Sequence, residues 1–201
     1  MPRKKTFSFK NLIHKNFRRL EQFIFLLKSL LTPRQFIYLS CVLVGISSAL
    51  AVIILKTFAH WVFKSSQKLD DILHLPFSNS TLPIIGIIIT VIIIKKVLDG
   101  SIEKGTSQIM YAVAKKRGIM PRKQMFAQII TSSFTVGMGG SAGLESPITI
   151  TGAAFGSNYA QNYRLSYKDR TLLLACGVAA GIGAAFNAPI AGVLFAIEVV
   201  L

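Results

Sequence analysis

The sequence predicts an all-α protein that crosses a membrane several times, and three observations support this prediction. Of its 201 residues, 52% are apolar and only 15% are charged, whereas ordinary soluble domains carry about 25% charged residues. The charges are also separated from long apolar runs. Runs without any charge cover residues 36–55, 75–94 and 171–197, and each reaches the roughly 20 residues that a helix needs to cross a bilayer. Disordered, coiled-coil, collagen-like and disulfide-rich proteins are excluded.

The first 34 residues form a separate basic segment. They contain nine Lys and Arg residues and a single acidic residue, Glu21, and apolar side chains recur at helical spacing over residues 20–31. An excess of positive charge keeps a segment on the cytoplasmic side, and this pattern is typical of a helix lying on a membrane surface. We therefore predict a cytoplasmic amphipathic segment at 1–34 and a membrane domain at 35–201. Lipid, rather than nucleic acid, is the expected partner.

Two membrane-crossing helices are predicted next. Thr32 and Pro33 form a plausible N-cap and first residue of a helix, which we expect to end near Phe63. The charge-balanced segment 64–74 is predicted to be an outside loop. A second apolar helix is predicted over 83–98, where it ends in basic residues.

The rest of the chain repeats one plan, in which apolar segments are interrupted by a break. Residues 95–123 and 164–170 are basic and are predicted to be cytoplasmic. The forty residues 124–163 suffice for two short passes with a break at 137–147, where four glycines and a proline interrupt any helix. A second break is predicted at 187–189, inside the last apolar stretch.

The first break is the best candidate for a functional site. Non-helical backbone is tolerated at membrane depth only where protein buries it or water reaches it. A helix that begins near Ser146 and Pro147 presents free N–H groups and a positive dipole end, which attract an anion. Glu145 is the only charge for some twenty residues on either side, and an isolated intramembrane carboxylate is costly enough to indicate a function. The alternative is that Glu145 simply caps the helix.

Other patterns predict packing rather than chemistry. Gly152 and Gly156, and likewise Gly177 and Gly181, are spaced as in pairs of closely packed membrane helices. No cluster of His, Cys and carboxylate residues has metal-ligand spacing, and no Ser/His/Asp set is evident. We therefore expect no catalytic residue, no metal and no cofactor, and no enzyme activity.

Three segments resemble motifs of the CLC family of chloride channels and proton/chloride exchangers. Residues 143–147 (GLESP) resemble the family's G-(K/R)-E-G-P motif. Residues 181–198 (GIGAAFNAPIAGVLFAIE) match its G-x-A-A-A-F-N-A-P-x-A-G-x-L-F-x-x-E segment almost letter for letter. Residues 106–110 (TSQIM) match its G-S-G-I-P motif weakly. The resemblance covers roughly residues 36–201.

The resemblance implies a fold and a set of site residues. It implies an inverted-repeat fold with broken and re-entrant helices, of which this chain would hold the first repeat, and a homodimer with one anion pathway in each subunit. Glu145 would be the gate. The residues implied to surround the anion are Ser107, Ile109, Leu144 and Ser146. The implied proton-path positions are Glu198 and Val199, where Val199 stands in place of the family's internal glutamate.

We therefore expect chloride or a similar small anion to be transported by channel-like conduction gated by Glu145, because the valine at position 199 cannot carry a proton. A proton-coupled chloride exchanger is one alternative. A non-transporting membrane fragment that serves as an assembly module is another. The resemblance also implies voltage gating and a place in the plasma membrane, with the N-terminus in the cytoplasm.

Overall fold

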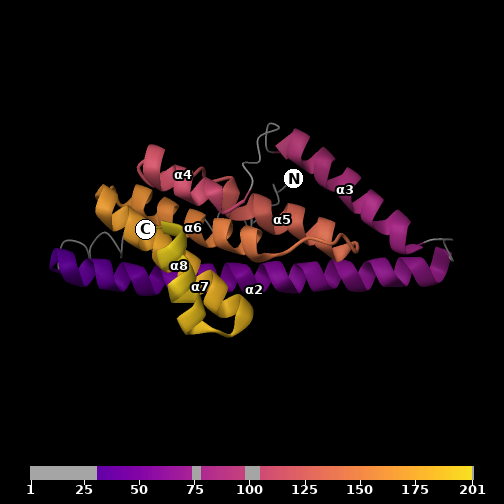
Figure 1. Ribbon diagram of the computed structural model, residues 1–201, viewed down its shortest axis with the longest axis horizontal. Coiled ribbons are helices and arrows are strands. Elements are labelled where there is room, and N and C mark those ends of the chain that lie inside the picture. The colour runs from indigo at the N-terminus through magenta and orange to yellow at the C-terminus, as the bar shows by residue number, and fades with distance from the viewer. Residues whose placement is uncertain (1–30, 74–77, 98–104, 201) are drawn as a thin grey trace, which may run out of the picture. The chain divides into compact units, whose positions relative to one another are not determined.

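The computed structural model describes residues 31–73, 78–97 and 105–200. All regular elements in these ranges are helices (Figure 1), which confirms the predicted all-α class. In chain order they are α2 (Pro33–Leu73), α3 (Ser78–Val97), α4 (Ser107–Lys115), α5 (Gln124–Gly137), α6 (Glu145–Asn162), α7 (Tyr167–Phe186) and α8 (Pro189–Val200). The predicted amphipathic helix over residues 20–31 lies almost wholly outside the described residues.

The chain divides into two compact units, Met1–Ser40 and Cys41–Leu201. In the described part of the first unit, Pro33 is the first residue of α2, as predicted. The N–H of Thr32 donates to Oε1 of Gln35 at 3.1 Å, and the Ser40 hydroxyl donates to the carbonyl of Phe36 at 2.7 Å.

Helix α2 is longer than the sequence analysis predicted. It continues past Phe63 to Leu73, so the loop predicted at 64–74 is wrong over most of its length. Polar and charged residues beyond 63 do not stop a helix when no glycine or proline interrupts them. Tertiary contact also supports the extension, because Ser66 is buried and donates hydrogen bonds to the carbonyls of Phe63 at 2.8 Å and Gly137 at 3.2 Å.

Helix α3 begins at Ser78, five residues before the predicted start, and Pro83 lies inside it. It packs against α5. The hydroxyls of Thr90 and Thr135 are 3.0 Å apart. Gly86 allows a close approach, since a Cβ there would lie 2.9 Å from Cβ of Met138 and 3.1 Å from the carbonyl oxygen of Phe134.

The predicted break is confirmed, because α5 ends at Gly137 and α6 begins at Glu145. Its observed bounds are narrower than predicted, since Ser146 and Pro147 already belong to the first turn of α6. Proline is tolerated there because the first-turn N–H groups have no partner within the helix.

Helices α6 and α7 form the closest helix pair in the second unit. A Cβ added at Gly152 would collide with the carbonyl oxygen of Gly177, and one at Gly156 with that of Leu173. This confirms the predicted packing role of Gly152, Gly156 and Gly177. Gly181 is packed more loosely, because a Cβ there would lie 3.4 Å from the carbonyl oxygen of Ile148, an ordinary contact.

The second predicted break is also confirmed. Helix α7 begins at Tyr167, four residues before the apolar stretch, with the hydroxyl of Ser166 accepting the N–H of Asp169 at 3.3 Å as an N-cap. It ends at Phe186, and the next residue, Asn187, has a left-handed backbone (φ 54°) and caps the helix through its N–H, which donates to the carbonyl of Gly183. Helix α8 then turns back along α7 (Figure 1).

Two helices of the described residues are long and apolar enough to cross a membrane. They are Pro33–Lys68 of α2 and Tyr167–Phe186 of α7. Their length and composition agree with the predicted membrane domain.

Candidate functional site

The break between α5 and α6 is held by the carbonyl groups at the end of α5. The N–H of Met138 donates to Phe134, that of Gly139 to Val136 and that of Gly140 to Thr135, at 2.9–3.1 Å. Gly139 has a φ of 89°, which a residue with a side chain rarely adopts. Further along the break, a Cβ at Gly143 would have no neighbour within 4 Å. The break is therefore anchored at its first residues and open just before α6.

Helix α6 begins without a side-chain cap. Its N-cap residue, Leu144, makes no side-chain cap hydrogen bond. Pro147 has no N–H, and the N–H groups of Glu145 and Ser146 find no acceptor among the described residues. Unpaired N–H groups and the positive end of the helix dipole favour an anion at this position.

The Glu145 side chain is exposed at this helix start. Within the described ranges its carboxylate has no hydrogen bond and no ion pair. The alternative role as a helix cap therefore finds no support in the hydrogen bonds of this region. Behind the first turn, α6 is buried, and Ile148 is only 2% exposed. An exposed, unpaired carboxylate thus stands at the first residue of a largely buried helix.

Ser107 and Ile109 lie at the start of a second helix, α4. Thr106 is its N-cap residue and makes no side-chain cap hydrogen bond, and Gly105 precedes it with a φ of 80°. Ser107 is exposed, whereas Ile109 is fully buried. The N–H of Ile109 donates to the carbonyl of Thr106 at 2.9 Å, so this N–H is already occupied.

Gln108 occupies the position of a motif glycine, and sequence analysis assigned it no role. Its side chain is only 5% exposed, and its Oε1 has no hydrogen-bond partner in the part of the chain that the structure describes. A buried amide with an unpaired oxygen is costly. Because glutamine stands where the family motif has glycine, this unpaired polar group lies at the residue next to Ser107.

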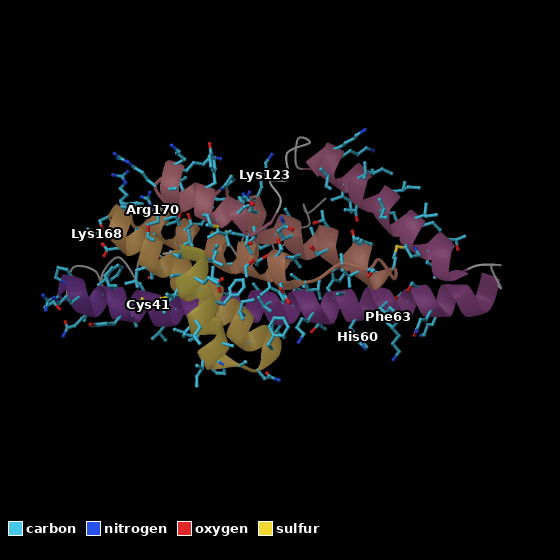
Figure 2. The ribbon with its side chains drawn as sticks, in the orientation of Figure 1. Cys41, His60, Phe63, Lys123, Lys168 and Arg170 are labelled. Carbon is cyan, nitrogen blue, oxygen red and sulfur yellow. The ribbon has the colours of Figure 1, made fainter. Side chains whose placement is uncertain are left out.

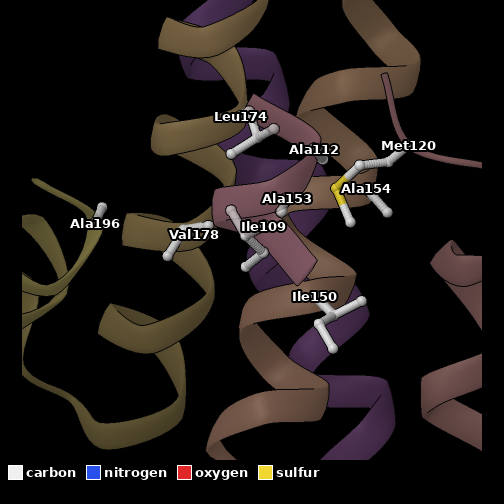
Figure 3. Packing of buried hydrophobic residues seen from close by; sticks show 9 residues of the cluster. All are labelled: Ile109, Ala112, Met120, Ile150, Ala153, Ala154, Leu174, Val178 and Ala196. Carbon is white, nitrogen blue, oxygen red and sulfur yellow. The ribbon is translucent and has the colours of Figure 1, made fainter. Parts of the chain in front are cut away.

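One buried cluster joins the start of α4 to the helices that carry the other predicted residues. Figure 3 shows Ile109 of α4 among side chains from α6 and α7. The cluster also contains Ile150, in the second turn of α6, and Ala196 of α8. The first turn of α4 and the beginning of α6 are thereby held in the same core.

Glu198 and Val199 of α8, the proton-path positions that the resemblance implies, lie in different surroundings. Val199 is half-buried and packs against the cluster that contains Ile109. Glu198 is exposed. Neighbouring residues on a helix point about 100° apart, so Glu198 does not occupy the inward position where Val199 stands.

Lys56 is a further residue that the sequence analysis missed. It lies within the apolar part of α2, and its Nζ donates to the carbonyl of Ala185 at 2.6 Å. This contact places a positive charge at the end of α7, beside the second break, where a cation complements the negative end of the helix dipole. The sequence does contain a feature that could have identified it: Lys56 is a single lysine directly after the charge-free run that ends at Leu55.

Residues 85–201 match the family profile described as voltage gated chloride channel. The chain belongs to this family. The matched region contains the first break, α6 and α8, so the resemblance carried by residues 143–147 and 181–198 is confirmed. Members of the family are integral membrane proteins that act as channels or transporters and not as enzymes.

Curated relatives are similar over part of the chain. A ClcB-like protein of Ralstonia nicotianae is 38% identical over 101 residues, which are 48% of this chain and 24% of that protein. Chloride channel protein CLC-c of Arabidopsis thaliana is 40% identical over 93 residues, 40% of this chain and 12% of the relative. The H(+)/Cl(-) exchange transporter ClcA of Yersinia pestis is 38% identical over 95 residues, 47% of this chain and 20% of the relative. The chain thus spans no more than about a quarter of these relatives.

Proposed function

We propose that this chain carries the gate of a chloride pathway and that Glu145 is the gate. The observation that carries the proposal is the exposed, unpaired carboxylate of Glu145 at the uncapped start of α6. A helix start of this kind attracts anions without the cost of burying a lysine. The carboxylate competes with chloride for the same N–H groups, so chloride enters when Glu145 is protonated or moves away.

We propose that the anion lies between the starts of α4 and α6. Ser107 and Ile109 would line it from α4, and Leu144 and Ser146 from α6. The two helix starts are linked through the core cluster that contains Ile109 and Ile150, which supports their acting together. The N–H of Ile109 donates to Thr106, so that residue would contribute its N–H only after this bond opens.

The gate is tested with Glu145→Gln in the full-length protein, reconstituted in liposomes. Glutamine has the shape of the protonated carboxyl and cannot ionise, so anion flux should persist and lose its pH dependence. Glu145→Asp is the matched control, because it keeps an ionisable group and should keep a pH dependence. If Glu145→Gln retains the pH dependence of the unmodified protein, Glu145 is not the gate.

We propose channel-like conduction rather than proton-coupled exchange. Val199 stands in the inward position on α8 and carries no titratable group, while Glu198 is exposed. Proton-coupled exchange is the second candidate, and the ClcA relative, named an H(+)/Cl(-) exchange transporter, favours it. In liposomes with an imposed chloride gradient, chloride flux without proton movement is the expected result. Uphill proton movement at a fixed stoichiometry would establish the exchanger.

We further propose a plasma-membrane protein with a cytoplasmic N-terminus that acts as a homodimer. Exposed apolar side chains on α8, such as Ile190 and Leu194, are consistent with an interface between subunits.

Topology is tested with single cysteines after replacement of Cys41 and Cys176. Gln67, which is exposed on α2, is the outside probe, and Lys116 is the inside probe. If an impermeant thiol reagent labels Lys116→Cys from outside, the topology is the reverse of the one proposed.

A further inference from the structure

Two segments at one end of α6 and α7 bring together a high density of positive charge. They are residues 115–123, which begin at the last residue of α4, and residues 164–170, which lead from α6 into the first turn of α7. Together they hold eight basic residues and a single carboxylate, that of Asp169. The basic residues are Lys115, Lys116, Arg117, Arg122, Lys123, Arg164, Lys168 and Arg170. We refer to these eight residues as the basic platform.

Hydrogen bonds fix the two segments against one another. Nη1 of Arg170 donates to the carbonyl of Arg117 at 3.0 Å, and its Nη2 donates to the carbonyl of Leu165 at 3.3 Å. The hydroxyl of Tyr167 reaches the carbonyl of Val113 at 3.3 Å. Gly118 packs against the same arginine, because a Cβ there would lie 3.4 Å from Cδ of Arg170. Figure 2 shows Lys168 and Arg170 where α7 begins.

The last turns of α6 hold the first segment from its other side. The N–H of Met120 donates to the hydroxyl of Ser157 at 2.9 Å, and Nε2 of Gln161 donates to the carbonyl of Met120 at 3.1 Å. Ser157 in turn donates to the carbonyl of Gly118, and Arg122 donates to the amide oxygen of Asn162. The backbone of the platform is therefore a fixed scaffold.

Several charges of the platform are exposed and are not paired with a carboxylate of the described residues. Lys115, Arg117, Arg164 and Lys168 are exposed and form no ion pair with any described residue. The one local carboxylate, Asp169, accepts a hydrogen bond from Ser166 at the start of α7 at 2.7 Å. The C-terminal ends of α4 and α6 attract some positive charge through their dipoles, but two helix ends do not neutralise the excess of basic residues in the platform.

The surroundings of the platform place it at a membrane surface. Tyr167 is the first residue of α7, which is long and apolar enough to cross a membrane. Tyr111, Ile119 and Tyr167 are exposed beside the basic side chains. Aromatic side chains next to basic ones are typical of the headgroup region of a bilayer.

We propose that the basic platform binds the phosphate-bearing headgroups of acidic phospholipids in the leaflet that it faces. Exposed positive charge next to a membrane helix attracts such lipids by about 1 kcal/mol for each Lys or Arg. The fixed scaffold keeps the charges close together, so the backbone need not be ordered at binding. This inference does not depend on chloride transport.

The test compares binding of phosphatidylglycerol and phosphatidylcholine to the full-length protein in nanodiscs or by native mass spectrometry. The variant Arg117→Gln/Arg164→Gln/Lys168→Gln removes three exposed charges and leaves the scaffold hydrogen bonds intact, because none of these three side chains takes part in them. Affinity for phosphatidylglycerol should fall on the order of 100-fold. The matched control Lys64→Gln/Lys95→Gln/Lys96→Gln removes three exposed charges that are not gathered on the platform, and it should lower the affinity clearly less than the platform variant does.

Three outcomes would overturn the proposal. They are an equal loss in the platform variant and its control, equal binding of the two lipids, and binding of soluble tripolyphosphate in preference to phosphatidylglycerol vesicles, which would indicate a soluble anion as the ligand. If the triple variant does not fold, Lys168→Gln alone is measured together with a salt titration. Roughly a fivefold loss is then expected, and binding that is insensitive to both the substitution and salt would overturn the proposal.

Discussion

The contact between α6 and α7 and the break before α6 are both rich in glycine, but glycine serves opposite purposes in them. At the contact, Gly152 and Gly156 lie against the backbone of α7, so there is no room for a side chain. In the break, a Cβ at Gly143 would have no neighbour within 4 Å. The first region uses glycine to bring two helices together. In the break, Gly137 and Gly140 are packed just as tightly against neighbouring backbone, and Gly143 alone leaves the start of α6 open.

This difference separates the scaffold from the site. A close helix pair has many buried contacts and resists displacement. The start of α6, which depends on that pair for its position, carries the exposed Glu145 and unpaired N–H groups. A substitution in the scaffold should therefore act on stability, and a substitution at the site should act on transport.

The largest effect is expected from Gly156→Ala. The added methyl group would collide with the carbonyl oxygen of Leu173 and lie 2.6 Å from its carbonyl carbon, and a backbone group cannot rotate away. Overpacking of this kind costs about 1–3 kcal/mol or more, which exceeds the roughly 1 kcal/mol that alanine gains over glycine in a helix. We expect a marked fall in the thermal unfolding midpoint of the protein in detergent.

Gly143→Ala is the matched control for this substitution. It adds the same methyl group in open space, so the free energy of unfolding should change by less than about 0.5 kcal/mol. If both variants unfold at the same temperature as the unmodified protein, α6 and α7 do not approach as closely as described. If Gly143→Ala is the more damaging of the two, the comparison between scaffold and break is wrong.

The sequence predicted the breaks and the helix contacts because both leave local signals. Gly137–Pro147 and Asn187–Pro189 contain residues that interrupt helices, and glycines spaced by four mark a close helix pair. The end of α2 was missed because the prediction followed apolar character, which does not by itself end a helix. Apolar character fades after Phe63, but a helix ends only where its backbone is interrupted or loses support, and a hydrogen bond from Ser66 to Gly137 supports it from 71 residues away.

The candidate site was predicted only as a set of positions. The resemblance implies that Glu145 is the gate, Ser107 an anion-binding residue and Val199 a proton-path position, but no sequence pattern states which side chains are buried or already bonded. The structure supplies this information, with Glu145 exposed and Ile109 buried. Lys56 was missed because its partner, the carbonyl of Ala185, lies 129 residues away and belongs to the backbone.

An intermediate effect is expected from Ser66→Ala, which removes the hydrogen bond between α2 and the end of α5. Loss of a buried hydroxyl that donates to a carbonyl on another helix costs about 1 kcal/mol. Ser65→Ala is the control, because Ser65 is exposed and bonds only within its own helix, to Trp61. The midpoint of unfolding should fall for Ser66→Ala and not for Ser65→Ala, and equal shifts would mean that α5 does not support this part of α2.

The smallest effect on stability is expected from Glu145→Gln. The carboxylate forms no hydrogen bond with the described residues, so its removal sacrifices only its attraction to the positive end of α6, which is worth about 0.3–1 kcal/mol at low ionic strength and less in salt. Unfolding measured at high and low salt checks this, with a small difference expected at low salt alone. A loss above about 2 kcal/mol that persists in salt would show that Glu145 is a structural cap. An unchanged midpoint combined with a lost pH dependence of flux would separate its role in gating from any role in folding, because the same carboxylate would then matter to transport and not to the fold.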